Sequence, residues 1–412
     1  MKRTVLFFTI VLIGTFVFAQ KANVNKALSK AQSEENPDFD EAKALIEAAL
    51  VNEETKDQAK TWWTAGRVYE LSSRNEQRKG DGYEASAGAD AMREYDLYLR
   101  AYELDFMPNA KGKVKPAYDK KIKESMASLY RSNILVNYSI KKQDNQMYEE
   151  AFDIMSRHLG IIDLEMLKND PKMMEDTLLQ KRDLYKQLKF YAGVWAWQAE
   201  KLPEALTCLS DIKSTGYKQQ EVYEYMATIC DQMKDSARYE EILREGSQVV
   251  PQSQFLIGNL INLYVDRKQT KDAIEYLQQA ISRNPTAQLY NVLGSVQETA
   301  GDLDNALVNF NKALEFDQDY VDAIANIGRL YYNQGVKIEE EAMEVKDPAK
   351  KKEMDARKNE KIRQALPYFE KAYELNMEDT QVQTMLRQTY YRLVQIDPKF
   401  KMKHPELSRG DF

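Results

Sequence analysis

The chain has 412 residues and a formal net charge of −7; 43% of its residues are hydrophobic and 30% are charged. With only 16 glycines and 11 prolines, this composition is typical of a folded helical protein and excludes a largely disordered chain. The negative charge argues against a duplex nucleic-acid ligand, because proteins that bind such ligands usually carry a basic face.

Residues 1–19 have the pattern of a secretory signal peptide. Lys2 and Arg3 form a short positive segment, residues 4–18 are apolar, and Ala19 suits cleavage before residue 20. The apolar run has about 15 residues against roughly 20 for a membrane span, so we expect cleavage rather than an uncleaved anchor. No cysteine follows the cleavage site, so we do not expect a lipoprotein. We expect an exported protein, periplasmic or otherwise envelope-associated, that meets a membrane only through a partner.

Residues 20–185 are predicted to form irregular helical repeats. Ala42, Ile46 and Ala49 share one helix face, and a matching first-helix pattern follows at 62–69. We expect a polar insert at 72–88 to delay the next helix, which resumes at 92–105. Residues 118–140 are predicted to form one long helix, and Asp170-Pro171 marks a break before the next helix.

Residues 287–320 carry the clearest pattern of the chain. Small and large apolar residues stand at positions 4, 7, 8, 20, 24 and 27 of this stretch: Tyr290, Leu293, Gly294, Ala306, Phe310 and Ala313. Gly294 and Ala306 are small enough for two antiparallel helices to touch, and Phe310 fills the space beside them. Gly301 and Asp302 supply the break between the helices, because Gly adopts the left-handed conformation that ends a helix.

The same spacing recurs in frames that start near 186, 220, 254 and 321. The pattern resembles the tetratricopeptide repeat (TPR), a helix-turn-helix unit of about 34 residues. The resemblance implies an all-α fold, a right-handed α-α superhelix (TPR solenoid) built of antiparallel helix pairs. We expect the regular array to cover 186–396, because a single repeat cannot bury its own apolar face.

The last full repeat is predicted to contain a charged helical insertion at 336–362. This segment lacks an apolar stripe, so we expect it to extend two helices outward with a turn near Asp347 and Pro348. Leu386 and Tyr390 mark a final unpaired helix, the C-terminal cap of the array. Residues 397–412 are expected to be a flexible tail. The sequence leaves open whether the inserts at 72–88 and 336–362 are functional.

No pattern in the sequence predicts catalysis, a metal site or a cofactor. Only two histidines are present, His158 and His404, and neither belongs to a metal-binding motif. Phosphate-binding glycine motifs are also missing from the sequence. Cys208 and Cys230 fall on successive predicted helices, where an oxidising compartment permits a disulfide, although both occupy core-like positions that favour buried free thiols.

The resemblance implies a concave groove lined by first-helix positions 2, 5, 9, 12 and 13. Carried onto this sequence, those positions give the candidate partner-binding residues Phe190, Trp197, Glu224, Asn262, Asn291, Arg329, Tyr332 and Tyr391. We therefore expect a non-catalytic scaffold that binds a protein or peptide partner. Two alternatives stay open: a helical-repeat protein, possibly an enzyme, that binds carbohydrate or cell-wall fragments, and a self-assembling component of an envelope or secretion complex that forms homo-oligomers.

Overall fold

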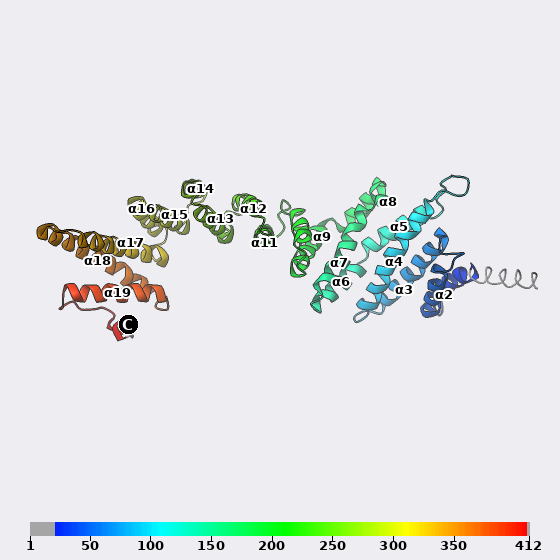
Figure 1. Ribbon diagram of the computed structural model, residues 1–412. Helices are drawn as coiled ribbons and strands as arrows, with labels where there is room; N and C mark the ends of the chain where they lie inside the picture. Colours follow the sequence, from blue (N-terminus) through cyan, green and yellow to red (C-terminus); the bar gives the residue numbers. More distant parts are fainter. Residues whose placement is uncertain (1–20, 410–412) are drawn as a thin grey trace, which may run out of the picture. The chain divides into compact units, whose positions relative to one another are not determined.

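The computed structural model describes the backbone of residues 21–409, and the side chains of these residues except 176–183 and 408–409. The signal peptide predicted at 1–19 therefore lies outside the described residues. Within the described range every regular element is a helix (Figure 1). The chain divides between Tyr239 and Glu240 into two compact units.

The first unit begins with a helix at residues 21–31. Its further helices are α2 (Phe39–Leu50), α3 (Ala59–Arg78), α4 (Glu84–Asp105), α5 (Asp119–Arg131), α6 (Ile134–Asp144), α7 (Tyr148–Gly160), η1 (Ile161–Asp163), α8 (Glu165–Lys168), α9 (Pro171–Gln198), α10 (Leu202–Ser210) and α11 (Gln219–Gln232). The division between the units falls inside α12 (Ser236–Val249).

The second unit continues with regular helix pairs. Its helices are α13 (Gln254–Asp266), α14 (Thr270–Arg283), α15 (Ala287–Thr299), α16 (Leu303–Phe316), α17 (Val321–Met343), α18 (Pro348–Leu375), α19 (Thr380–Ile396) and η2 (Pro405–Arg409). The predicted domain boundary at 185–186 falls inside α9. The predicted boundary separates irregular from regular repeats, whereas the division at Tyr239 separates compact units. The division therefore does not test the boundary, which stays a prediction.

Polar caps fix where several helices begin. The side chains of Ser253, Thr286 and Asp302 each accept a hydrogen bond from a backbone N–H in the first turn of α13, α15 and α16. Such bonds satisfy donors that have no partner inside the helix. Gly301 adopts the predicted left-handed conformation, φ +83°, between α15 and α16. The local sequence thus determines these boundaries.

Helix pairs in both units pack a glycine of the first helix against a large side chain of the second. A Cβ atom added to these glycines would lie only 2.6–2.9 Å from the facing side chain in the pairs Gly66–Tyr98, Gly193–Leu209, Gly294–Phe310 and Gly328–Phe369. The predicted contact between positions 8 and 24 is therefore confirmed. The all-α repeat of antiparallel helix pairs is also confirmed.

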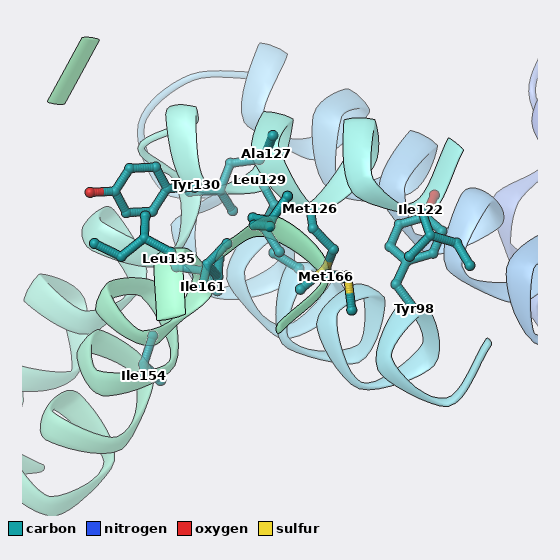
Figure 2. Packing of buried hydrophobic residues seen from close by; sticks show 14 of the residues in the cluster. Tyr98, Ile122, Met126, Ala127, Leu129, Tyr130, Leu135, Ile154, Ile161 and Met166 are labelled. Atoms are coloured by element: carbon teal, nitrogen blue, oxygen red, sulfur yellow. The ribbon is translucent and has the colours of Figure 1, made fainter. Parts of the chain in front are cut away.

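The core of the first unit includes its short, irregular elements. Ile161 of η1 and Met166 of α8 are buried together with Met126 of α5, Leu135 of α6 and Ile154 of α7 (Figure 2). These short elements thus bury apolar side chains against α5, α7 and α9. The prediction that repeats in this half are irregular stays a prediction.

Two predicted elements of the first unit were wrong. The long helix expected at 118–140 breaks at Ser132, whose backbone is extended (ψ 159°) and whose hydroxyl donates to the Leu129 carbonyl. Such side-chain bonds compete with the helical backbone. The insert expected at 72–88 does not break the helices until residue 92, because α3 continues to Arg78 and α4 begins at Glu84; the inserted residues lengthen both helices, so that Gly66 faces Tyr98. Its polar residues are partly buried, and Ser72 donates to Asp90 inside the pair.

The insertion at 336–362 extends α17 and α18, as predicted, with Asp347 capping α18. Contrary to expectation, Ala342, Met354 and Ile362 are buried, so a thin apolar strip joins the two extensions. The terminal helix α19 packs on α18, as predicted. The segment after α19 differs from the expected flexible tail, because Leu407 is buried in one core with Phe369 of α18 and Tyr390 of α19.

Candidate functional site

The sequence-predicted residues lie on first helices in both units. Phe190 and Trp197 belong to α9, Glu224 to α11, Asn262 to α13, Asn291 to α15, Arg329 and Tyr332 to α17, and Tyr391 to α19. The structure places Phe190 with Trp197, Asn291 with Arg329, and Tyr332 with Tyr391, in three separate groups. Asn262 is exposed on α13 and joins none of these groups.

The group in the first unit is an aromatic cluster centred on Tyr225. Ring centroids lie 5.2 Å apart for Trp197 and Tyr225 and 6.1 Å apart for Phe190 and Tyr225. The Trp197 indole N–H donates to Gln232 Oε1 at 2.8 Å. Phe190 is only 4% exposed, so it packs in the core and offers little surface to a partner. Glu224 accepts a hydrogen bond from Gln220 at 2.9 Å.

The second group lines a cavity of about 240 Å³ in the second unit, which we call the inner pocket. Its lining combines amide, acidic and apolar side chains with one arginine: Asn291, Asp322, Ala325, Asn326, Arg329, Phe369, Asp379, Gln381, Val382 and Met385. These residues come from α15, α17, α18 and α19 and from the cap of α19. Successive repeats thus contribute to one surface.

Hydrogen bonds hold the polar side chains of the inner pocket in place. Asn326 Nδ2 donates to Asn291 Oδ1 at 2.9 Å, and Arg329 Nη2 donates to Asn326 Oδ1 at 2.9 Å. Arg329 also pairs with Glu298 at 2.9 Å. Burial raises the pKa of Glu298, and the positive charge of Arg329 opposes that shift. The network fixes the directions of the amide and guanidinium groups before any partner binds.

The third group lines a cavity of about 910 Å³ between the extension of α17 and the terminal helix α19, which we call the cap pocket. Its lining residues are Tyr332, Glu339, Met343, Gln388, Tyr391, Arg392 and Gln395. Arg392 Nε donates to the Tyr332 hydroxyl at 3.0 Å, and Arg392 Nη1 donates to Glu339 at 2.6 Å. The hydrogen bond from Arg392 lowers the pKa of Glu339.

The exposed part of the cap pocket is apolar and aromatic. Met343 is 70% exposed and Tyr391 is 52% exposed, while Tyr332 is buried at 7%. Large exposed apolar side chains around an ordered polar floor are typical of sites where a partner anchors. The insertion therefore supplies one wall of a candidate site.

Several residues of these surfaces were missed from the sequence. Asn326 and Tyr225 stand at position 6 of their frames, next to the groove positions that we carried over. Glu339 and Met343 lie in the insertion, for which the repeat pattern makes no prediction. A helical projection that continued the stripe of Arg329 and Tyr332 along α17 would have pointed to Glu339.

The described part of the chain offers little reactive chemistry. His158 is buried and stacks on Tyr130 with centroids 4.9 Å apart. Cys208 and Cys230 are both buried, and no disulfide joins them. Among the described residues no three His, Cys, Asp or Glu side chains cluster as metal ligands would. In the same part of the chain no helix is both long and apolar enough to span a membrane.

Comparison with known proteins agrees with the helix-pair packing. A tetratricopeptide repeat model matches residues 258–286, and a TPR repeat model matches residues 299–335. The fold and these surfaces define a helical-repeat protein whose successive helix pairs build candidate interaction surfaces. Residues 258–286 and 299–335 of the chain thus match tetratricopeptide repeats. Members of this class generally serve as non-catalytic scaffolds for protein interactions.

Solved structures of other repeat proteins are also similar to parts of the chain. A TPR repeats protein from Bacteroides fragilis is 18% identical, covering 63% of this chain and 98% of its own, with a TM-score of 0.34. MamA from Desulfovibrio magneticus is 17% identical, covering 47% and 97%, with a TM-score of 0.31. YrrB, a TPR protein with an unusual peptide-binding site, is 16% identical, covering 50% and 94%, with a TM-score of 0.32. No curated protein matches the chain.

Proposed function

We propose that this protein is an exported, non-catalytic scaffold of the cell envelope that holds an extended segment of another protein. The inner pocket and the cap pocket of the second unit are the proposed contact surfaces. The N-terminal pattern of Lys2, Arg3 and the apolar residues 4–18 supports export. N-terminal sequencing of the protein from cells tests export: a mature chain that begins at residue 20 supports it, and a retained Met1 contradicts it.

The observation that carries the proposal is the ordered polar network of the inner pocket. Asn291, Asn326 and Arg329 come from two successive first helices, and their hydrogen bonds fix their orientation. Side-chain amides both donate and accept, so they match the alternating N–H and C=O groups of an extended peptide backbone. Little side-chain freedom is left to lose on binding, which favours affinity.

The charges around the inner pocket indicate what kind of segment it takes. Asp322 and Asp379 line it, and Arg329, its one cationic lining residue, is paired with Glu298. An acidic lining attracts a basic side chain or an amide donor and disfavours a carboxylate. The cap pocket supplies exposed Met343 and Tyr391 for an apolar anchor of the same partner.

Co-purification from envelope extracts tests the proposal. The tagged mature chain should retain a reproducible partner, and the double variant Arg329→Ala/Tyr391→Ala should retain at least about tenfold less of it, because hydrogen bonds to charged groups and aromatic anchors each contribute about 1 kcal/mol or more. Arg283→Ala is the matched control, because Arg283 is an exposed arginine at the end of the second helix α14. Equal retention by the double variant and the wild type would contradict the groove assignment.

A further inference from the structure

We propose that the first unit carries a separate binding site for a neutral sugar ring, between α3 and α5. The site is a cavity of about 330 Å³, distinct from the surfaces of the second unit. Its lining comes from two first helices only: Trp63, Arg67, Glu70, Lys121, Glu124, Ser125 and Ser128. Nothing in the repeat pattern requires a polar cavity at this place.

A buried polar network forms the base of this cavity. Glu70 is 7% exposed, and its Oε2 accepts hydrogen bonds from the Tyr98 hydroxyl at 2.6 Å and from Ser125 at 3.1 Å. Its Oε1 pairs with Arg67 at 2.8 Å. Glu94 is completely buried behind it and lies 3.9 Å from Arg74, whose guanidinium donates to Ser128 at 3.3 Å.

Such a network costs free energy that apolar packing would not. Burying a carboxylate loses its hydration, and replacing buried ion pairs by apolar side chains of similar size is often neutral or stabilising. Burial and the neighbouring charge of Glu70 both raise the pKa of Glu94. Costly polar groups beside an open cavity are more typical of ligand sites than of structural cores.

The charges that line the cavity balance, which disfavours an ionic ligand. Arg67 and Lys121 are positive, whereas Glu70 and Glu124 are negative. An anion would meet two carboxylates, and a cation would meet two basic groups. A hydroxyl group both donates and accepts hydrogen bonds, so a polyhydroxylated neutral ligand satisfies the acids, the bases and the serine hydroxyls of this lining together.

Trp63 supplies the flat apolar face that the C–H side of a sugar ring needs. Its ring stacks on Tyr118 with centroids 5.0 Å apart and an interplanar angle of 27°. This contact holds the indole in one orientation. Lys121 Nζ lies over the Trp63 ring, 4.9 Å from its centroid, so a sugar that rests on the indole takes the place of this ammonium group and can accept a hydrogen bond from it. An amphipathic aromatic beside convergent polar groups fits one sugar unit of a glycan.

The test uses titration calorimetry of the whole mature chain with chitotetraose, cellotetraose and maltotetraose. We expect saturable binding of at least one of these neutral oligosaccharides. Lys121→Ala and Glu124→Gln should each weaken it about tenfold, and Trp63→Leu should weaken it more. Lys141→Ala is the matched control in the first unit: Lys141 is exposed on α6 and does not line the cavity, so this variant should bind like the wild type.

Lys121 and Glu124 are both exposed, and Glu124 is 56% exposed, so replacing either side chain leaves the core unchanged. A loss of binding in these variants therefore reports on the site and not on misfolding. Circular dichroism should show equal helicity for all variants. No saturable binding, or binding that Lys121→Ala and Glu124→Gln leave unchanged, would overturn the proposal. Saturable binding of inorganic phosphate or of L-arginine in place of the oligosaccharides would also overturn it.

Discussion

Replacing a single glycine tests the packing that defines the repeats. A Cβ atom at Gly294 would lie 2.6 Å from Cε1 of Phe310 and 3.0 Å from the Ala306 carbonyl oxygen. Phe310 and Ala306 are both completely buried, so neither can move aside freely. By contrast, a Cβ atom at Gly258 of α13 meets nothing within 4 Å. Alanine at these two positions should therefore have opposite effects.

The magnitudes follow from two competing contributions. Alanine in a helix interior is favoured over glycine by about 1 kcal/mol. Overpacking a tight core costs about 1 to 3 kcal/mol. Gly258→Ala meets only the first contribution and should stabilise its helix pair by up to about 1 kcal/mol. Gly294→Ala meets both contributions. Because its Cβ atom would lie so close to a buried ring, the overpacking cost should be near the upper end of its range. We therefore expect a net destabilisation of about 1 to 2 kcal/mol.

Hydrogen exchange in native conditions measures both variants. Peptides from α15 and α16 should lose protection in Gly294→Ala, and peptides from α13 and α14 should gain it in Gly258→Ala. Unfolding in urea followed by circular dichroism gives the corresponding free energies. Equal or greater stability of Gly294→Ala relative to the wild type would refute the close helix contact.

Three further predictions concern other parts of the chain. Burial raises the pKa of Glu94, so protonated Glu94 stabilises the folded chain below the unfolded-state pKa near 4.5, and this stabilisation is lost as the pH rises through the folded-state pKa. Glu94→Gln should therefore be more stable than the wild type at pH 8 in urea unfolding followed by tryptophan fluorescence. Lower stability of the variant at that pH would contradict burial as the cause of the raised pKa. Deleting residues 336–360 places Gly335 where the turn glycine Gly301 stands in the preceding repeat, so we expect a folded chain by circular dichroism that has lost the cap pocket and its partner contact; an unfolded product would show instead that the insertion is structural. Cys208 and Cys230 are buried and no disulfide joins them, so mass spectrometry after alkylation should find both thiols modified in denaturant and unmodified in native buffer; a species lighter by two hydrogens would indicate a disulfide.

The regular repeats could be predicted because their spacing has a direct steric cause. Gly294 and Phe310 stand 16 residues apart, as do Gly193 and Leu209, and each pair makes the contact that the spacing requires. Gly328 and Phe369 make the same contact across the insertion, because both helices lengthen together and keep their facing positions. Periodicity therefore determines which residues face each other.

Other features could not be predicted because the sequence does not show which partner a polar side chain finds. Ser72 and Ser73 suggested an exposed insert, yet both are buried and bond to Asp90 and Glu94. The apolar stripe through Met126 and Ile134 suggested one helix, but the Ser132 side chain bonds to the backbone and ends it. Composition alone does not show which polar group finds a buried partner.

The candidate site could be predicted only in part. Arg329, Asn291 and Tyr332 follow from the repeat register, and all three line pockets of the second unit. Phe190 follows from the same register but is buried, because neighbouring aromatic residues cover it. The wall that Glu339 and Met343 supply depends on the insertion, whose length and packing no repeat pattern determines.

Photo-crosslinking in living cells tests the scaffold proposal most directly. A benzophenone amino acid replaces Tyr391, which is 52% exposed in the cap pocket, and in a matched control it replaces Val308, which is 50% exposed on the second helix α16. The proposal predicts that position 391 links reproducibly to one other envelope protein and that position 308 does not. Links only between copies of this chain, or equal links from both positions, would contradict it.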